Sequence, residues 1–210
     1  KSGLVGRVDV SQYRLAMHLS MAFIILGITF QTLFDTGISD IKDNNFYLKT
    51  NNEFLFSLLL LLIFFQIAYG AFVSGTHSGL LYNTWPMYDG YIFPLIENNS
   101  LRGVINFFET GEYIIFLHRS FAILLLFIVI YINYVFFKNN CKINKNYLFI
   151  FFNIIFLFQI LLGILMTFQN IPWHLALAHQ GNAIILFLVT ISMWMLSKKS
   201  HRSNYLRRDF

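Results

Sequence analysis

Three histidines lie inside long apolar stretches of the sequence, where ionisable side chains are rare. They are His18, His118 and His179. Because a buried polar group is costly in lipid, such residues are functional candidates by default. Each could form a hydrogen bond to a neighbouring helix, or its neutral imidazole could ligate a metal. All three fall about one to two turns below the outer end of their stretch, so we expect at least one pair of ligands.

We expect His118 and His179 to be ligands of the same metal. The sequence has one cysteine, Cys141, and few carboxylates at that depth, so a zinc or di-iron site lacks ligands. Two neutral imidazoles from different helices suit the axial positions of a heme. His174 diverges from His179 by about 140° around one helix, so we expect His174 at the membrane interface.

Two further residues could take part, and the sequence leaves their roles open. Arg119 follows His118 at the outer edge of its stretch. Its guanidinium could pair with a heme propionate or extend to a lipid phosphate. His77 could ligate a metal or a heme, although a histidine in a loop is more often exposed.

The elements that must position these histidines are membrane spans. Of the 210 residues, 57% are hydrophobic and 12% are charged, whereas a soluble domain averages about 45–50% apolar and about 25% charged residues. A span needs about 20 mostly apolar residues. Five stretches qualify, at residues 13–34, 54–73, 113–137, 147–168 and 173–196. They are apolar at consecutive positions, unlike membrane strands. The predicted fold is an all-α, polytopic transmembrane helix bundle.

Lysine and arginine residues predict how the helices are oriented. They cluster in the loop after the third span and in the tail 197–210, and such clusters favour the inner side of a membrane. This places the C-terminus in the cytoplasm or matrix, the loop 36–52 inside and the long stretch 74–112 outside. The net charge of +5 therefore reflects the ends of spans, and the expected partner is the lipid bilayer, with no nucleic acid.

The first span is similar to the fifth around its histidine. Residues 15–18 (LAMH) are followed by Ala22, and residues 175–179 (LALAH) are followed by Ala183. Repeated halves are common in membrane proteins. If the fifth span closes a four-helix half, residues 53–196, then the span within residues 1–35 closes another half whose earlier helices are absent. We therefore expect the chain to be a fragment.

Four segments resemble motifs of the heme A synthase family. They are residues 2–16 (SGLVGRVDVSQYRLA) followed by His18, residues 82–87 (YNTWPM) with Asp89 and Gly90, His118-Arg119, and His179-Gln180. The resemblance runs along essentially the whole chain, and the YNTWP sequence is specific. The chain departs from the family pattern at residues 75–79 (GTHSG), and it lacks the outer-loop cysteine pairs of some relatives.

The resemblance implies a fold and a set of ligands. The fold has eight helices in two similar four-helix halves, of which this chain holds the fourth to the eighth. A heme b is then bound by His118 and His179, and Arg119 is our candidate for a further cofactor-binding residue because it follows His118. His18 is implied at the catalytic site, as one of the ligands that hold the substrate heme O.

The resemblance also implies a reaction and partners. A methyl group of heme O is oxidised to a formyl group, with water as the oxygen source, to give heme A for cytochrome oxidase. The partners would be heme O synthase and cytochrome oxidase assembly factors, in a bacterial plasma membrane or the mitochondrial inner membrane, and a homo-oligomer is compatible with this reading. The chain by itself is expected to be inactive, because half of the substrate pocket would be missing.

Two other functions fit the same helices. In a di-heme b-type electron-transfer protein, His18 would pair with a histidine outside this chain and both hemes would stay unmodified. A transporter that uses buried histidines as proton relays would be free of pigment, and the small number of buried carboxylates counts against it.

Overall fold

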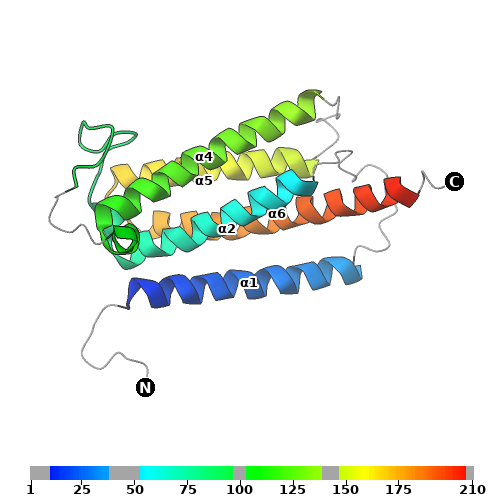
Figure 1. Cartoon of the computed structure of the whole chain (residues 1–210), viewed down its shortest axis with the longest axis horizontal. Coiled ribbons are helices and arrows are strands. Elements are labelled where there is room, and N and C mark those ends of the chain that lie inside the picture. Colours follow the sequence, from blue (N-terminus) through cyan, green and yellow to red (C-terminus); the bar gives the residue numbers. More distant parts are fainter. Residues whose placement is uncertain (1–9, 38–52, 97–102, 139–146, 207–210) are drawn as a thin grey trace, which may run out of the picture.

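The computed structural model describes residues 10–37, 53–96, 103–138 and 147–206 (Figure 1), with side chains up to Lys198 on the last helix. The helices are α1 (Gln12–Gly37), α2 (Glu53–Gly75), α3 (Asn106–Glu109), α4 (Gly111–Lys138), α5 (Tyr147–Phe168) and α6 (Trp173–Leu206). All except α3 are long and apolar enough to cross a membrane. Within the described ranges no strand forms, so the predicted all-α fold with five spans is confirmed.

The last helix is longer than the sequence predicted. We expected its span to end at Leu196 and a basic tail to follow, whereas α6 continues to Leu206. No glycine or proline follows Leu196 before that point, so nothing in the backbone stops the helix where its side chains turn polar. The predicted outer segment up to residue 9, most of the inner loop 36–52, and the basic loop 139–146 lie outside the described residues.

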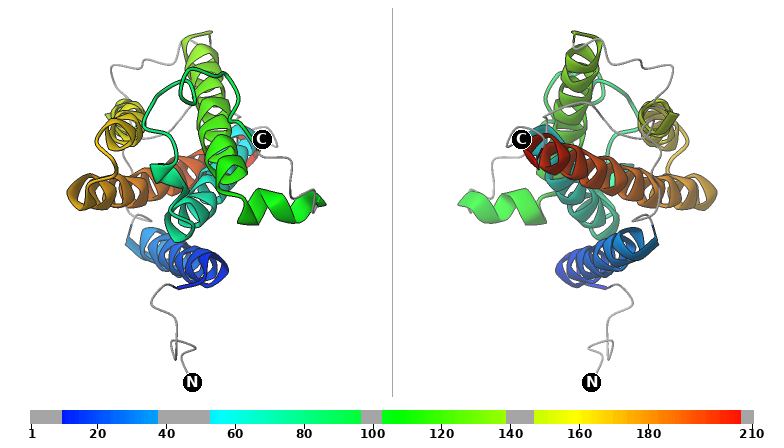
Figure 2. Two further views of the ribbon diagram at one scale, coloured as in Figure 1. Left: turned by 90° about the vertical axis from the view of Figure 1, so that its left-hand side faces the viewer. Right: turned by 90° about the vertical axis from the view of Figure 1, so that its right-hand side faces the viewer.

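Four of the spans form a bundle, and α1 lies against its outside. Helix α2 packs against α4 and α6, and α5 packs against α6. Helix α1 packs against α2 and α6 on the side away from α4 and α5, as Figures 1 and 2 show. The short α3 points away from the bundle (Figure 2). The sites described below therefore lie among α2, α4, α5 and α6.

Helices α4 and α5 meet near the C-terminal end of α4 and the N-terminal end of α5. The rings of Phe136 and Phe149 stack with centroids 4.0 Å apart. Beside them, Asn133 Nδ2 donates to Asn153 Oδ1 at 2.8 Å. This pair is satisfied within the protein, as polar side chains inside lipid must be.

Aromatic side chains fill the core and attach α1 to it. The largest fully buried side chains include Phe56, Phe152 and Met193. Phe23 of α1 packs edge to face against Phe187 of α6, with centroids 5.2 Å apart. A glycine lets the start of α1 approach the end of α2, because a Cβ on Gly75 would lie 2.7 Å from Cα of Gln12.

Helices α1, α4 and α6 all begin at one end of the molecule (Figure 1). His18, His118 and His179 each lie about two turns, or about 10 Å, from the start of their helix. The three histidines therefore lie at a similar depth, as the sequence predicted.

Candidate functional site

His118 of α4 faces a glutamine and a glycine of α2. Gln66 Nε2 donates to the backbone carbonyl of His118 at 3.0 Å and lies 3.5 Å from Nε2 of its imidazole. One turn further along α2 is Gly70, where a Cβ would lie 3.3 Å from Cε1 of His118. Helix α2 thus places the amide of Gln66 and a glycine, which has no side chain, next to the ring.

His179 of α6 has the same surroundings on α5. Gln159 Nε2 lies 3.1 Å from Nε2 of His179. A Cβ on Gly163 would again lie 3.3 Å from Cε1 of the imidazole. Asn182, one turn beyond His179, donates its amide to Gln159 Oε1 at 2.7 Å. The two histidines are therefore held in matching ways by two separate helix pairs.

Unpartnered buried polar atoms gather at these two histidines. Among the described residues, the buried side-chain nitrogen and oxygen atoms without a hydrogen-bond partner are Gln66 Oε1, His118 Nδ1 and His179 Nδ1. Each such atom costs about 1–3 kcal/mol. Both histidine residues are half-buried. Two imidazoles with polar capacity left over fit the axial ligands of a heme.

No larger ligand set is present in the part of the chain that the structure describes. No group of three or more His, Cys, Asp or Glu side chains there could hold a metal ion. A heme needs only two axial ligands from the protein, because its porphyrin supplies the others. The site therefore suits a heme better than a zinc or di-iron centre.

Arg119 ties the outer loop to α4. Its guanidinium donates to the carbonyls of Thr84 at 3.0 Å and Tyr82 at 3.1 Å, and it lies 4.8 Å from the centre of the Tyr88 ring. Burial raises the pKa of Tyr88 although Arg119 lowers it, so the contact is a cation–π interaction with a neutral phenol. Arg119 is only 8% exposed, which does not match an arginine that extends to lipid phosphate.

The loop that Arg119 contacts is also stabilised by hydrogen bonds and a ring contact within itself. The Thr84 hydroxyl donates to the carbonyl of Met87 at 2.8 Å and accepts from the backbone N–H of Asp89 at 2.8 Å. Tyr88 packs edge to face on Tyr82, with centroids 5.2 Å apart. The segment with the YNTWP sequence is therefore held against α4 by Arg119, the residue next to His118.

His18 does not join the other two histidines. It is exposed on α1, on a face that no described element covers. A helix face can be compared by the residues seven, eleven and fourteen positions after its histidine. On α4 and α6 these residues are buried: Leu125, Val129 and Ile132 after His118, and Leu186, Thr190 and Met193 after His179. The corresponding residues of α1, Ile25, Thr29 and Thr32, are exposed. The histidine face that points into the bundle on α4 and α6 points outward on α1.

The sequence matches known proteins along most of its length. A family model described as "cytochrome oxidase assembly protein" matches residues 1–191. The chain belongs to this family. Similar proteins include the heme A synthases of Wolbachia pipientis wMel, 37% identical over 89% of this chain and 51% of that protein, and of Pelagibacter ubique, 39% identical over 88% and 52%. That of Bartonella quintana is 33% identical over 93% and 53%.

Family membership confirms the resemblance to heme A synthases. The chain spans about half the length of the curated relatives it matches. The candidate functional residues are therefore argued only from the part of those relatives that this chain covers.

Sequence reasoning missed the two glutamines and two glycines beside the histidines. A signal for them exists, because α2 and α5 share a six-residue pattern: residues 65–70 read FQIAYG and residues 158–163 read FQILLG. The spacing of four puts each glutamine and glycine on one face of a helix. A search for repeats among the spans without histidine would have found this pattern.

Two other histidines whose side chains the structure describes, His77 and His174, lie outside the site. His77 is exposed in the outer loop, in a left-handed conformation with φ of 55°. His174 is also exposed and packs edge-on against Trp173, with ring centroids 5.9 Å apart. The exposure of His77 is the one we expected for a histidine in a loop.

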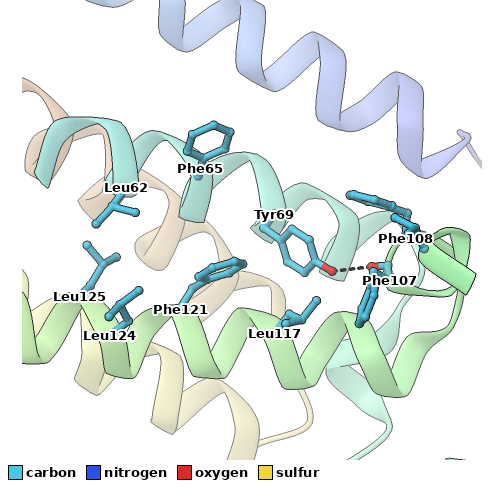
Figure 3. Close-up of a pocket in the computed structure, with 10 residues that line it drawn as sticks. Leu62, Phe65, Tyr69, Phe107, Phe108, Leu117, Phe121, Leu124 and Leu125 are labelled. Carbon is cyan, nitrogen blue, oxygen red and sulfur yellow. Dashed lines mark hydrogen bonds between the residues drawn. The ribbon is translucent and has the colours of Figure 1, made fainter. Parts of the chain in front are cut away.

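An apolar cavity of about 500 Å³ lies on another side of the α2–α4 pair, beneath α3 (Figure 3). It is lined by Leu62, Phe65, Tyr69, Val104, Phe107, Phe108, Leu117, Phe121, Leu124 and Leu125. The Tyr69 hydroxyl donates to the carbonyl of Phe107, so the polar end of that side chain is already satisfied. Neither His118 nor Gln66 lines the cavity, which makes it separate from the histidine site.

Substituting Gly163 by valine is expected to weaken heme binding by at least about tenfold, as loss of a supporting contact around a metal ligand commonly does. The new Cβ would already lie 3.3 Å from the His179 ring, and the branched methyl groups would push the imidazole aside. The measurement is heme b per polypeptide after titration with heme. Gly181→Ala on α6 is the control, since a Cβ there meets nothing within 4 Å. Equal heme content in both variants would contradict the prediction.

Proposed function

We propose that this chain is the C-terminal part of a heme A synthase, in which His118 and His179 bind a heme b. The observation that carries the proposal is the pair of matching sites, where all three unpartnered buried polar atoms of the described residues gather. A bound heme b supplies one-electron redox chemistry. In this role the chain's own residues hold the two imidazoles at one depth and exclude water through the aromatic core.

Arg119 is proposed to bind a propionate of that heme. Among the described residues no carboxylate forms an ion pair with it, and Asp89 acts on it only through longer-range electrostatics. A guanidinium has five N–H donors, and the two loop carbonyls leave some of them free. The same group can therefore hold the loop and still bind an anion at the outer edge of the site.

His18 is proposed to be a ligand at the site where heme O is oxidised. Its face of α1 is open at every position that is buried on α4 and α6. This supports a second histidine site, completed by the part of the relatives that this chain does not span. Conversion of the methyl to a formyl group removes electrons and protons from heme O and takes oxygen from water, so the reaction needs an electron acceptor; His118 and His179 would hold the redox group that accepts single electrons. We propose that residues 1–210 alone lack this activity.

The proposed setting follows from the same role. The relatives' family description is cytochrome oxidase assembly, so heme O synthase and other assembly factors are the proposed partners. The membrane would be a bacterial plasma membrane or the mitochondrial inner membrane. The basic residues after α4 and along the end of α6 are the basis for proposing that the C-terminus lies on the cytoplasmic or matrix side.

The decisive experiment supplies heme O to a protein that joins this chain to the part that its relatives have and this chain does not span. Membranes that make heme O but lack their own heme A synthase should then accumulate heme A, detected in extracted pigments by chromatography and mass. Unchanged heme O, together with two unmodified b hemes on the protein, would instead identify an electron carrier. Protein that binds no heme would contradict both the heme A synthase and the electron carrier.

A further inference from the structure

The apolar cavity between α2 and α4 is separate from the histidines and has no part in the proposed function. Its walls come from two membrane-spanning helices, and it extends from Phe107 on α3 to Leu62 on α2 and Leu125 on α4 (Figure 3). Its volume of about 500 Å³ is typical of sites that bind small molecules. We propose that it binds one hydrocarbon chain of a membrane phospholipid.

The walls of the cavity offer nothing to a polar ligand. All of the lining residues are aliphatic or aromatic, and Tyr69 is the one among them with a polar side-chain group. Its hydroxyl already donates to the carbonyl of Phe107. Because burying a polar group without a hydrogen bond is costly, a headgroup, a sugar or a quinone ring would not be held here. The part of the ligand inside the cavity is therefore hydrocarbon.

The cavity runs along the helices, which is the direction of a lipid chain. Leu62 and Tyr69 are seven residues apart on α2, and Leu117 and Leu125 are eight residues apart on α4. With a rise of about 1.5 Å per residue, these separations correspond to about 10–12 Å along the helix axes. One leaflet supplies about 15 Å of the hydrocarbon core of a bilayer. A chain parallel to the spans therefore fits the cavity within one leaflet.

The short helix α3 closes the cavity at the end where α4 begins, and side-chain contacts fix it there. The ring of Phe108 packs against those of Tyr69 and Phe72, with centroids 6.2 Å and 5.4 Å apart. Next to it, Glu109 accepts a hydrogen bond from the hydroxyl of Tyr13 on α1 at 3.3 Å. The walls are thus formed before a ligand enters, so binding does not have to order them.

The cavity opens sideways between α2 and α4. Tyr69 and Leu125 are buried at its base, whereas Phe65 and Leu124 at its rim are exposed. None of the lining residues comes from α1, α5 or α6, so lipid can reach the opening along the described part of the chain. Lipid tails are as apolar as leucine, so the preference for the cavity comes from dispersion contacts with its fixed walls. The bound chain would therefore exchange with the surrounding lipid.

The test labels the protein with a photoreactive lipid. The chain, extended by the part of its relatives that it does not span, is placed in phosphatidylcholine vesicles in which a small fraction of the lipid carries a diazirine in the middle of one chain. After irradiation, labelled peptides are quantified by mass spectrometry. We expect Phe121 and Leu125 in the cavity to carry severalfold more label than Leu157 and Leu161, which are exposed apolar residues of α5.

Two matched pairs of variants locate the label. Leu62→Trp fills the cavity, and Leu61→Trp makes the same change at the next residue of α2, which does not line it. On α4 the pair is Leu124→Trp in the cavity and Ile123→Trp outside it, at side chains that are 45% and 46% exposed. The two filling variants should lower the cavity label to the level found on α5, and the two controls should keep it.

A second measurement uses no label. Added phosphatidylcholine should raise the unfolding temperature of the protein in detergent, because a ligand that binds the folded state stabilises it. This rise should be smaller for Leu62→Trp than for Leu61→Trp. If one filling variant does not fold, the pair on the other helix gives the same comparison.

Three results would overturn the proposal. Equal label on the cavity and on α5 would mean that the cavity holds only the lipid that surrounds any span. A cavity label that both filling variants leave unchanged, or a cavity that stays unlabelled because the rest of the protein covers it, would exclude the site. Displacement of the label by a quinone at a concentration far below that of the phospholipid would assign the cavity to an isoprenoid tail instead. None of these results depends on heme, so the proposed function is tested separately.

Discussion

Substituting His118 or His179 by alanine is expected to remove the low-spin bis-imidazole bands of the heme b spectrum and to lower heme b content by more than about tenfold. Each substitution would delete one of the two proposed heme ligands. Formation of heme A should fall to background, because the proposed electron route is lost. The measurements are absorption spectra of purified protein and pigment analysis of the membranes.

His174→Ala and His77→Ala are matched controls for this experiment. The first removes an exposed histidine from the same helix as His179, and the second removes one from the outer loop. Both variants should keep the bands of the unsubstituted protein. Full bis-imidazole bands in His118→Ala or His179→Ala would refute the ligand assignment and remove the basis of the proposed enzyme.

Substituting Arg119 by methionine is expected to lower the free energy of unfolding by about 2–4 kcal/mol. Hydrogen bonds from a charged donor are worth about 1.5–3 kcal/mol each, and a cation–π contact adds about 0.5–2 kcal/mol. Part of this gain is offset, because the variant no longer buries a charge. The carbonyls of Tyr82 and Thr84 would lose their donors. The measurements are denaturant unfolding in detergent micelles and the rate of proteolysis within the outer loop.

The free energy of unfolding of Arg119→Lys should lie between that of the unsubstituted protein and that of Arg119→Met. A lysine keeps the charge, but its ammonium cannot donate to two carbonyls as the planar guanidinium does. Lys138→Met is the control, as it removes an exposed charge at the far end of the same helix. The prediction is wrong if Arg119→Met unfolds like Lys138→Met and its outer loop is cleaved no faster. In that case Arg119 would not hold the loop.

The number and nature of the spans could be predicted from the sequence alone. Hydropathy over about 20 residues is a local property, so five apolar runs were enough to place five helices, and the confirmed bounds differ mainly where α6 continues to Leu206. The end of a helix depends on the backbone as well as on polarity. A polar segment without glycine or proline can remain helical outside the membrane.

The candidate histidines could also be found locally, because an ionisable residue within an apolar run needs no partner to be conspicuous. The hydrogen-bonding partners of these histidines could not be found from local sequence. Gln66 and His118 are 52 residues apart in the sequence, and their contact depends on how α2 and α4 are rotated against each other. The same holds for Arg119, because the contacts of its guanidinium with the carbonyls of Tyr82 and Thr84 depend on the fold and do not follow from its position next to His118.

The sequence by itself therefore determined which segments are helices, that they belong in a membrane, and which histidines lie inside apolar helices. Only the tertiary structure decided which glutamine meets which imidazole and that His18 faces outward from α1. The physical reason is that a helix face becomes interior or surface only through the rotation and packing of its neighbours, which short-range patterns of residues do not encode.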